Sequence, residues 1–140
     1  MRMPEDEART RFGVGRIARL ATAGADGRLH LVPVTFALHG DIVATAIDHK
    51  PKSTPDLRRL RNIREHPSVC LLADHYAEDW SRLWWARADG LARIVTDPAE
   101  CAAPLAWLAA KYPQYQAQPP AGPVILVTID HWTGWQASPA

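Results

Sequence analysis

The chain has 140 residues, of which 47% are hydrophobic and 22% charged, and its formal net charge is +1. These values are typical of a globular domain and exclude a low-complexity chain. No stretch reaches the roughly 18 apolar residues of a membrane helix, and the charged N-terminus differs from a signal peptide. Two cysteines are too few for a disulfide framework. We therefore expect a cytoplasmic protein without a membrane span that folds as one domain over residues 1–140.

The small net charge hides an asymmetry along the chain. Residues 1–70 carry 12 basic and 8 acidic side chains, whereas residues 71–140 carry 4 basic and 7 acidic ones. Six of the cations lie between Lys50 and Arg64, against the single acid Asp56. Such a run usually marks a solvated helix surface, and the alternative is a basic track for a polyanion. Because the isoelectric point of about 7.9 is below the values typical of nucleic-acid-binding domains, we expect no nucleic acid as a partner.

Strand signals separated by tight turns follow a short N-terminal helix in the first third of the chain. The Asp26-Gly27 pair is typical of a hairpin turn, and a second turn is expected at 39–41. Pro33 cannot donate a hydrogen bond to a neighbouring strand, so it marks an edge, a bulge or a break that faces a ligand. We predict a helix over 4–15 and strands over 16–23, 28–38 and 42–47.

The next helix is predicted to begin near Thr54, which can cap it, with Pro55 at its first helical position. It ends at His66, because a residue before proline avoids the helical conformation. Asp89-Gly90 is expected to form a bulge in a long strand. We predict strands over 68–73, 81–95 and 124–129, the last continuing to Trp135, a helix opened by the capping box 97–100, and a loop over 113–122.

The predicted order is thus helix, three strands, helix, two strands, helix and strand. Three successive strands joined by hairpin signals are incompatible with a doubly wound parallel sheet. The sequence therefore predicts a mainly β fold with flanking helices (α+β), built as an antiparallel barrel.

The stretch from Thr45 to Pro55 places two lysines and two hydroxyls between the end of a strand and the start of a helix. A helix N-terminus presents unpaired N–H groups and a partial positive charge. Lys50, Lys52 and Ser53 would add point charge and short hydrogen bonds, which together suit a phosphate. The glycines of a Walker loop are missing. The alternative is a solvated loop before an ordinary capped helix.

Aromatic and cationic side chains alternate along the predicted strand 81–95. On a strand, Arg82 and Trp84 would share one face, and Trp85 and Arg87 the other. One or two of the tryptophans are candidates for stacking on a planar ligand. The alternative is packing in the core and at a subunit interface, where tryptophan is enriched.

No group of residues has the pattern of a catalytic side-chain centre. The histidines lack metal-ligand spacing, no serine lies in a nucleophile elbow, and both cysteines lie in apolar patterns. We therefore expect the chemistry of any enzyme built on this chain to reside in a cofactor.

Several short motifs occur in order along the chain. They are Leu20-Ala21-Thr22, Asp26-Gly27, His30-Leu31-Val32-Pro33-Val34, Thr45-Ala46-Ile47-Asp48, Lys50-Pro51-Lys52-Ser53, Leu57-Arg58-Arg59-Leu60, His66-Pro67-Ser68-Val69 and Trp132-Thr133-Gly134-Trp135. In this order they resemble the pyridoxamine-phosphate-oxidase-like, FMN-binding split-barrel superfamily. Within it, the chain is similar to the actinobacterial branch that uses the deazaflavin coenzyme F-420.

This resemblance implies an antiparallel split β-barrel that forms a homodimer, with two cofactor sites at the interface. The residues that it implies at each site fall into four groups. They are Val32, Pro33 and Val34 at the flavin-type ring, Thr45, Ala46 and Ile47 at the ribityl chain, Lys50, Lys52 and Ser53 at the phosphate, and Trp84, Arg87 and Trp135 from the partner subunit.

The choice between F-420 and FMN depends on the tail of the cofactor. F-420 carries an acidic lactyl-oligoglutamate tail, which needs a basic track beyond the phosphate. Arg58, with Arg61 and Arg64, would offer such a track. This favours F-420 over FMN, with haem or no redox ligand as the remaining alternatives.

The resemblance thus implies an oxidoreductase that transfers a hydride between coenzyme F-420 and a small organic substrate. An FMN-dependent oxidoreductase of the same fold is the first alternative. A protein that binds or sequesters the cofactor without a substrate of its own is the second, because no substrate pocket is legible in the sequence. A structural or nucleic-acid-binding role is the third.

Overall fold

The computed structural model describes residues 1–47 and 57–138. The helices are α1 (Glu5–Val14), α2 (Arg58–Glu65), α3 (Pro98–Lys111) and α4 (Pro113–Ala117), with a 3-10 helix, η1, over Trp80–Arg82. The strands are β1 (Ala18–Ala23), β2 (Leu29–Val34), β3 (Ala37–His39), β4 (Ile42–Ala46), β5 (Ser68–His75), β6 (Trp84–Val95) and β7 (Val124–Gln136).

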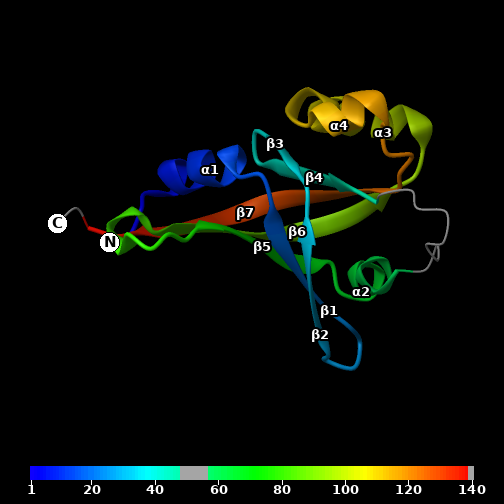
Figure 1. Cartoon of the computed structure of the whole chain (residues 1–140). Coiled ribbons are helices and arrows are strands. Elements are labelled where there is room, and N and C mark those ends of the chain that lie inside the picture. Colours follow the sequence, from blue (N-terminus) through cyan, green and yellow to red (C-terminus); the bar gives the residue numbers. More distant parts are fainter. Residues whose placement is uncertain (48–56, 139–140) are drawn as a thin grey trace.

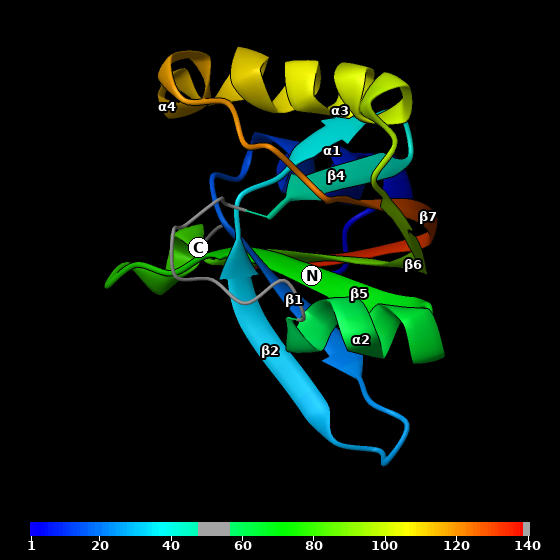
Figure 2. The same cartoon turned by 90° about the vertical axis from the view of Figure 1, so that its right-hand side faces the viewer.

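All seven strands form one antiparallel sheet in the order β2-β1-β5-β6-β7-β4-β3. The sheet curls into half of a barrel, with helices packed against it (Figures 1 and 2). This confirms the predicted mainly β fold with flanking helices and its split-barrel form. No helix within the described residues is long and apolar enough to span a membrane.

An aromatic cluster holds α1 against the sheet. Phe12 of α1 is fully buried, and its ring centre lies 4.7 Å from that of Phe36 and 5.4 Å from that of Trp132 on β7. Gly134 of β7 permits this packing, because a Cβ there would come within 3.0 Å of Ala8 on α1. The helix therefore covers one face of β6 and β7 at close range.

The predicted strand 28–38 is split into β2 and β3, and the break has a physical cause. The two residues between these strands hydrogen-bond outside the sheet. The carbonyl oxygen of Thr35 accepts a hydrogen bond from Thr45 Oγ1 at 2.7 Å, and the N–H of Phe36 donates to Tyr112 Oη at 3.1 Å. These bonds satisfy backbone groups that would otherwise belong to the strand ladder.

The strand predicted over 81–95 begins later than expected. Asp79 Oδ1 accepts hydrogen bonds from the N–H of Ser81 at 3.1 Å and from its hydroxyl at 2.6 Å, which closes η1 before the strand starts. Arg82 therefore belongs to η1 and does not alternate with Trp84 as predicted.

Two helix predictions also need correction. The predicted loop 113–122 contains α4, because proline suits the first position of a helix and a buried tyrosine anchors the turn. Helix α2 begins at Arg58, after an extended Leu57 and later than predicted. The predicted cap Thr54 and first residue Pro55 lie outside the described residues.

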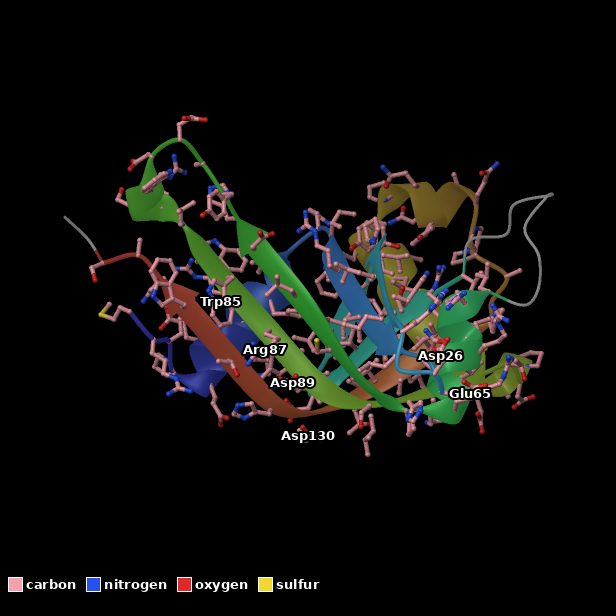
Figure 3. The ribbon with its side chains drawn as sticks, turned by 90° about the horizontal axis from the view of Figure 1, so that it is seen from below. Asp26, Glu65, Trp85, Arg87, Asp89 and Asp130 are labelled. Atoms are coloured by element: carbon pink, nitrogen blue, oxygen red, sulfur yellow. The ribbon has the colours of Figure 1, made fainter. Side chains whose placement is uncertain are left out.

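β6 and β7 pair along most of their length and bend at a bulge (Figure 3). The register shifts between Asp89 and Gly90, and Asp130 of β7 stands between their two partners. This confirms the predicted bulge. A Cβ on Gly90 would overlap the backbone carbonyl of Thr128, so the two strands approach too closely there for any side chain.

Lys111, the last residue of α3, ties that helix to the last turn of α1 and to the residue that follows it. Its Nζ donates to the carbonyl oxygens of Gly15 at 2.6 Å and Gly13 at 3.3 Å, and lies 3.7 Å from the centre of the Phe36 ring. Burial, and secondarily the charge of Arg16, lowers the pKa of Lys111 from 10.5 to about 8. These contacts therefore hold the Lys111 ammonium group in a position that is only partly accessible to water.

We predict that Gly90→Ala lowers the free energy of unfolding by about 1–3 kcal/mol, because the added methyl group has to displace the backbone of β7. Urea denaturation followed by circular dichroism measures this change. The control is Leu91→Ala, which truncates a neighbouring side chain that is 54% exposed and should cost far less. Equal losses for the two variants would contradict the close approach of the strands.

The pKa of Lys111 predicts a dependence of stability on pH. Between about pH 8 and 10.5, the unfolded chain binds more protons at this lysine than the folded chain, so its contribution to stability rises with pH across that window. We expect the wild type to gain stability relative to Lys111→Met over this range, as measured by chemical denaturation at constant ionic strength. A difference that stays constant through the window would mean that the folded protein leaves the pKa unshifted.

Candidate functional site

A pocket of about 390 Å³ lies where the ends of β2 and β4 meet the start of α2. Six residues were expected at the ring and ribityl chain of a cofactor, and five of them line this pocket: Pro33, Val34, Thr45, Ala46 and Ile47. They come from the ends of β2 and β4, which are not neighbours in the sheet. The sixth, Val32, pairs with Leu20 on β1 and packs against the core instead. We call this the β2–β4 pocket; its lining is Ile17, Pro33, Val34, Thr35, Thr45, Ala46, Ile47, Leu57, Arg59 and Tyr115.

Fixed polar contacts build the wall of the β2–β4 pocket. Thr45 is buried, and its Oγ1 donates to the carbonyl oxygen of Thr35 at 2.7 Å. The hydroxyl of Thr35 lies 2.6 Å from Tyr115 Oη. At the end of β4, the N–H of Ile47 donates to the carbonyl oxygen of Pro123 at 3.0 Å. The hydroxyl proton of Thr45 is thus engaged by the backbone, so this residue shapes the pocket rather than donating into it.

The residues predicted to hold a phosphate lie outside the described residues. These are Lys50, Lys52 and Ser53. The residues that border the segment 48–56, Ile47 and Leu57, both line the β2–β4 pocket. The described residues on both sides of the segment 48–56 therefore lie at the wall of this pocket.

The start of α2 contributes Arg59 to the pocket, whereas Arg58, which was predicted to contact the tail of the cofactor, lies outside it. Helix α2 buries Leu60 and Ile63, which leaves Arg59 half-buried at the pocket wall and Arg58 exposed to solvent. The sequence analysis missed Arg59 because the facing of an arginine depends on where the helix begins. The spacing to the two buried aliphatic residues was the only signal that could have found it.

The pKa of His30 on β2 is affected by the positive charge at the start of α2. Its partial burial, and then the charges of Arg58 and Arg59, lower its pKa. The lowered pKa favours the neutral form of this imidazole. His30 begins one of the motifs on which the resemblance rests, but the sequence did not indicate its proximity to these arginines, because they lie on a segment far away in the chain.

The residues predicted to reach the site from a partner subunit gather elsewhere. Trp84, Arg87 and Trp135 line a second pocket of about 460 Å³, which shares no residue with the β2–β4 pocket. Trp85 and Trp135 are cross-strand partners, and the Arg87 guanidinium lies 5.6 Å from the centre of the Trp85 ring (Figure 3). Arg87 Nε also lies 3.3 Å from Asp89 Oδ2. We call this the tryptophan pocket.

Trp85 and Arg87 of the tryptophan pocket lie on one face of the sheet (Figure 3), whereas Trp84 packs against the core, with the Arg11 guanidinium of α1 5.5 Å from its ring centre. Strand register aligns Pro33, Arg19, Leu72 and Arg87 in one row across β2, β1, β5 and β6. In the next row, Leu31 on the edge strand β2 is 67% exposed. We call these rows, with the tryptophan pocket, the open sheet face. Exposed apolar patches of this kind are typical of interaction surfaces.

The lining of the β2–β4 pocket can bind and orient a molecule but offers few groups for proton transfer. Among its described lining residues, only Arg59 and Tyr115 carry titratable side chains. Across residues 1–47 and 57–138, no three His, Cys, Asp or Glu side chains gather in a way that could hold a metal ion. The pocket therefore suits a largely apolar ligand with an anionic end toward α2.

Solved structures share this fold at low sequence identity. A FAD-binding protein from Mesorhizobium loti matches with a TM-score of 0.72 and 17% identity, over 99% of this chain and 98% of that protein. A conserved hypothetical protein from Mycobacterium tuberculosis matches with a TM-score of 0.75 and 20% identity, over 96% and 85%. A FAD-binding protein from Mycobacterium smegmatis matches with a TM-score of 0.67 and 17% identity, over 99% and 100%.

Sequence comparison identifies the family. No curated protein matches the chain by sequence. The family profile described as pyridoxamine 5'-phosphate oxidase matches residues 4–136, a span that includes both pockets and all seven strands. The chain therefore belongs to the pyridoxamine 5'-phosphate oxidase family.

Proposed function

We propose that the protein is an oxidoreductase that transfers a hydride between coenzyme F-420 and a small organic substrate. The β2–β4 pocket carries this proposal, because it gathers Pro33, Val34, Thr45, Ala46 and Ile47 from separate strands. Membership of the pyridoxamine 5'-phosphate oxidase family supports an oxidoreductase. The FAD-binding proteins that share the fold support a flavin-type cofactor.

The described residues of the β2–β4 pocket suit the parts of such a cofactor. Pro33 and Val34 offer an apolar wall to the ring, and residues 45–47 would contact the ribityl chain. Arg59 lies at the α2 end of the pocket, and the lining residues Ile47 and Leu57 flank the segment 48–56 with its two lysines in the sequence. Charge-assisted hydrogen bonds from such groups suit a phosphate. When bound, the deazaflavin supplies or accepts the hydride.

The chain's own residues act by binding and orientation. The hydrogen bonds of the pocket wall hold the backbone in one arrangement, so a bound ring keeps a fixed position toward the substrate. Aliphatic side chains exclude water from one face of that ring. No side-chain nucleophile is needed for this chemistry, in agreement with the lining residues.

The cations around α2 favour F-420 over FMN. Arg58 and Arg61 line a separate hollow that shares no lining residue with the β2–β4 pocket, and they would contact the carboxylates of an acidic tail. The two acids in that hollow are engaged by the turn between β1 and β2: Glu65 accepts from the N–H of Ala25, and Asp26 from that of Arg28. FMN ends at its phosphate and would leave the hollow unused, which makes it the alternative cofactor.

The open sheet face supports a homodimer in which two chains complete each site. Within one chain, the tryptophan pocket and the β2–β4 pocket are separate. Pro33 belongs to both the β2–β4 pocket and the open sheet face, so a second copy seated on that face would bring its tryptophan pocket near the cofactor. Leu29 and Leu31, which are 84% and 67% exposed, would then be buried.

We predict that Lys52→Ala weakens cofactor binding at least about tenfold, because a charge-assisted hydrogen bond contributes roughly 1.5–3 kcal/mol. Fluorescence titration with F-420 and, separately, with FMN measures the affinities. Arg93→Ala is the control: it removes one positive charge from a 64% exposed side chain that pairs with Glu100 outside both pockets. Equal affinities of wild type and Lys52→Ala would contradict the phosphate role, and tighter binding of FMN would reassign the cofactor.

Binding of reduced F-420 without its oxidation by any of a broad panel of acceptors would favour the sequestering alternative.

We predict that Leu31→Arg converts a dimer into a monomer and lowers cofactor affinity, because a charge is buried without a partner at the interface. Sedimentation velocity gives the oligomeric state. Val14→Arg is a matched control, since Val14 is also 67% exposed but lies at the end of α1, away from the open sheet face. A monomeric wild type, or a Leu31→Arg variant that remains dimeric, would overturn the proposed dimer.

A further inference from the structure

A third pocket, of about 530 Å³, adjoins the β2–β4 pocket. Ile17, Thr35 and Tyr115 line both, so the two spaces adjoin at these side chains. We call it the α4 pocket; its lining is Arg16, Ile17, Thr35, Tyr112, Pro113, Gln114 and Tyr115. None of these residues was singled out in the sequence as a binding residue.

Two tyrosine rings give the α4 pocket a rigid aromatic wall. The rings of Tyr112 and Tyr115 meet edge to face, with centres 5.6 Å apart and an interplanar angle of 68°. Both hydroxyls are anchored: Tyr112 Oη bonds the backbone of Phe36, and Tyr115 Oη lies 2.6 Å from Thr35 Oγ1. Both side chains are only 8% exposed, so with their polar ends held each ring offers a small, fixed apolar surface to an organic group.

Arg16 supplies the charge of the α4 pocket. Its Nη1 donates to the carbonyl oxygen of Lys111 at 3.0 Å, and its guanidinium lies 5.8 Å from the centre of the Tyr112 ring, so the group is held in place. Among the residues that the structure describes, no carboxylate pairs with Arg16. No acidic side chain lines the pocket either. A fixed guanidinium without a counter-charge, beside aromatic rings, is suited to a carboxylate on a planar molecule.

We propose that the α4 pocket binds planar organic anions, with the carboxylate at Arg16 and the ring system against Tyr112 and Tyr115. Resting on the proposed function, it is the substrate subsite of the enzyme, because it adjoins the β2–β4 pocket at Ile17, Thr35 and Tyr115. The substrate class is then a planar, largely apolar carboxylate.

The test uses 2-naphthoate and its neutral isostere 2-naphthamide, each titrated calorimetrically into the full chain without cofactor. We expect the wild type to bind the carboxylate about tenfold more tightly than the amide, and Arg16→Gln to lose this preference. Arg16→Lys keeps the positive charge and should therefore retain part of the preference for the carboxylate. Arg28→Gln is the matched control: this arginine is also exposed, lies in the turn before β2 and lines none of the three pockets.

The outcomes separate this inference from the proposed function. A preference for naphthoate that Arg16→Gln abolishes and Arg28→Gln retains supports the anion site. Equal binding of naphthoate and naphthamide by the wild type, or an undiminished preference in Arg16→Gln, overturns it. Titrations of the same variants with F-420 and FMN test the proposed function independently, since Arg16 lies outside the β2–β4 pocket and its substitution should leave their affinities unchanged.

Discussion

The hydroxyl of Tyr112 is the contact on which both the β2–β4 pocket and the α4 pocket depend. It accepts a hydrogen bond from the N–H of Phe36 at 3.1 Å and lies 2.8 and 3.0 Å from the carbonyl oxygens of Arg16 and Phe36. Burial raises the pKa of Tyr112, so the group keeps the proton that it donates. One side chain at the end of α3 thereby satisfies backbone groups on two segments that are far apart in the sequence. A buried backbone group left unpaired there would cost as much as a lost hydrogen bond.

This contact explains why binding spaces form at the break between β2 and β3. The backbone at Thr35 and Phe36 leaves the ladder because Tyr112 and Thr45 provide better partners. The departure opens the β2–β4 pocket on one side of Thr35, and the aromatic rings of Tyr112 and Tyr115 enclose the α4 pocket on the other. The same bonds that interrupt the sheet thus hold two adjoining pockets in a fixed relation.

Each of these binding spaces contains at least one arginine. The basic first half of the chain supplies Arg59 to the β2–β4 pocket, Arg58 to the neighbouring hollow and Arg16 to the α4 pocket. No acidic side chain lines either pocket. A flavin-type cofactor and an anionic substrate would each meet a cation held on a rigid element. The protein would then contribute position and electrostatic attraction, while the cofactor carries the redox chemistry.

Short-range signals in the sequence were sufficient for most of the fold. The Asp26-Gly27 turn, the Asp89-Gly90 bulge and the helix that follows Asp97 were predicted correctly, because each depends on the conformational preferences of a few adjacent residues. The predicted capping box was wrong, because the Asp97 side chain makes no capping hydrogen bond, and the proline at the first helical position marks the start of α3 instead. Of the ring and ribityl residues that the resemblance implied, all but Val32 line one pocket. These residues are consecutive, 33–34 and 45–47, so they line the pocket because it lies at the ends of β2 and β4 rather than because they share one face of a strand.

By itself, the sequence determined the order of the strands and helices, the turns and the division of charge, since these are properties of neighbouring residues. Only the tertiary structure decided that Arg59 rather than Arg58 lines the β2–β4 pocket, that residues 28–38 form two strands, and that Arg16 meets Tyr112. Each of these depends on a contact between segments distant in the chain. Such contacts arise when buried polar groups find partners and apolar faces pack, and no local pattern encodes which partner is found.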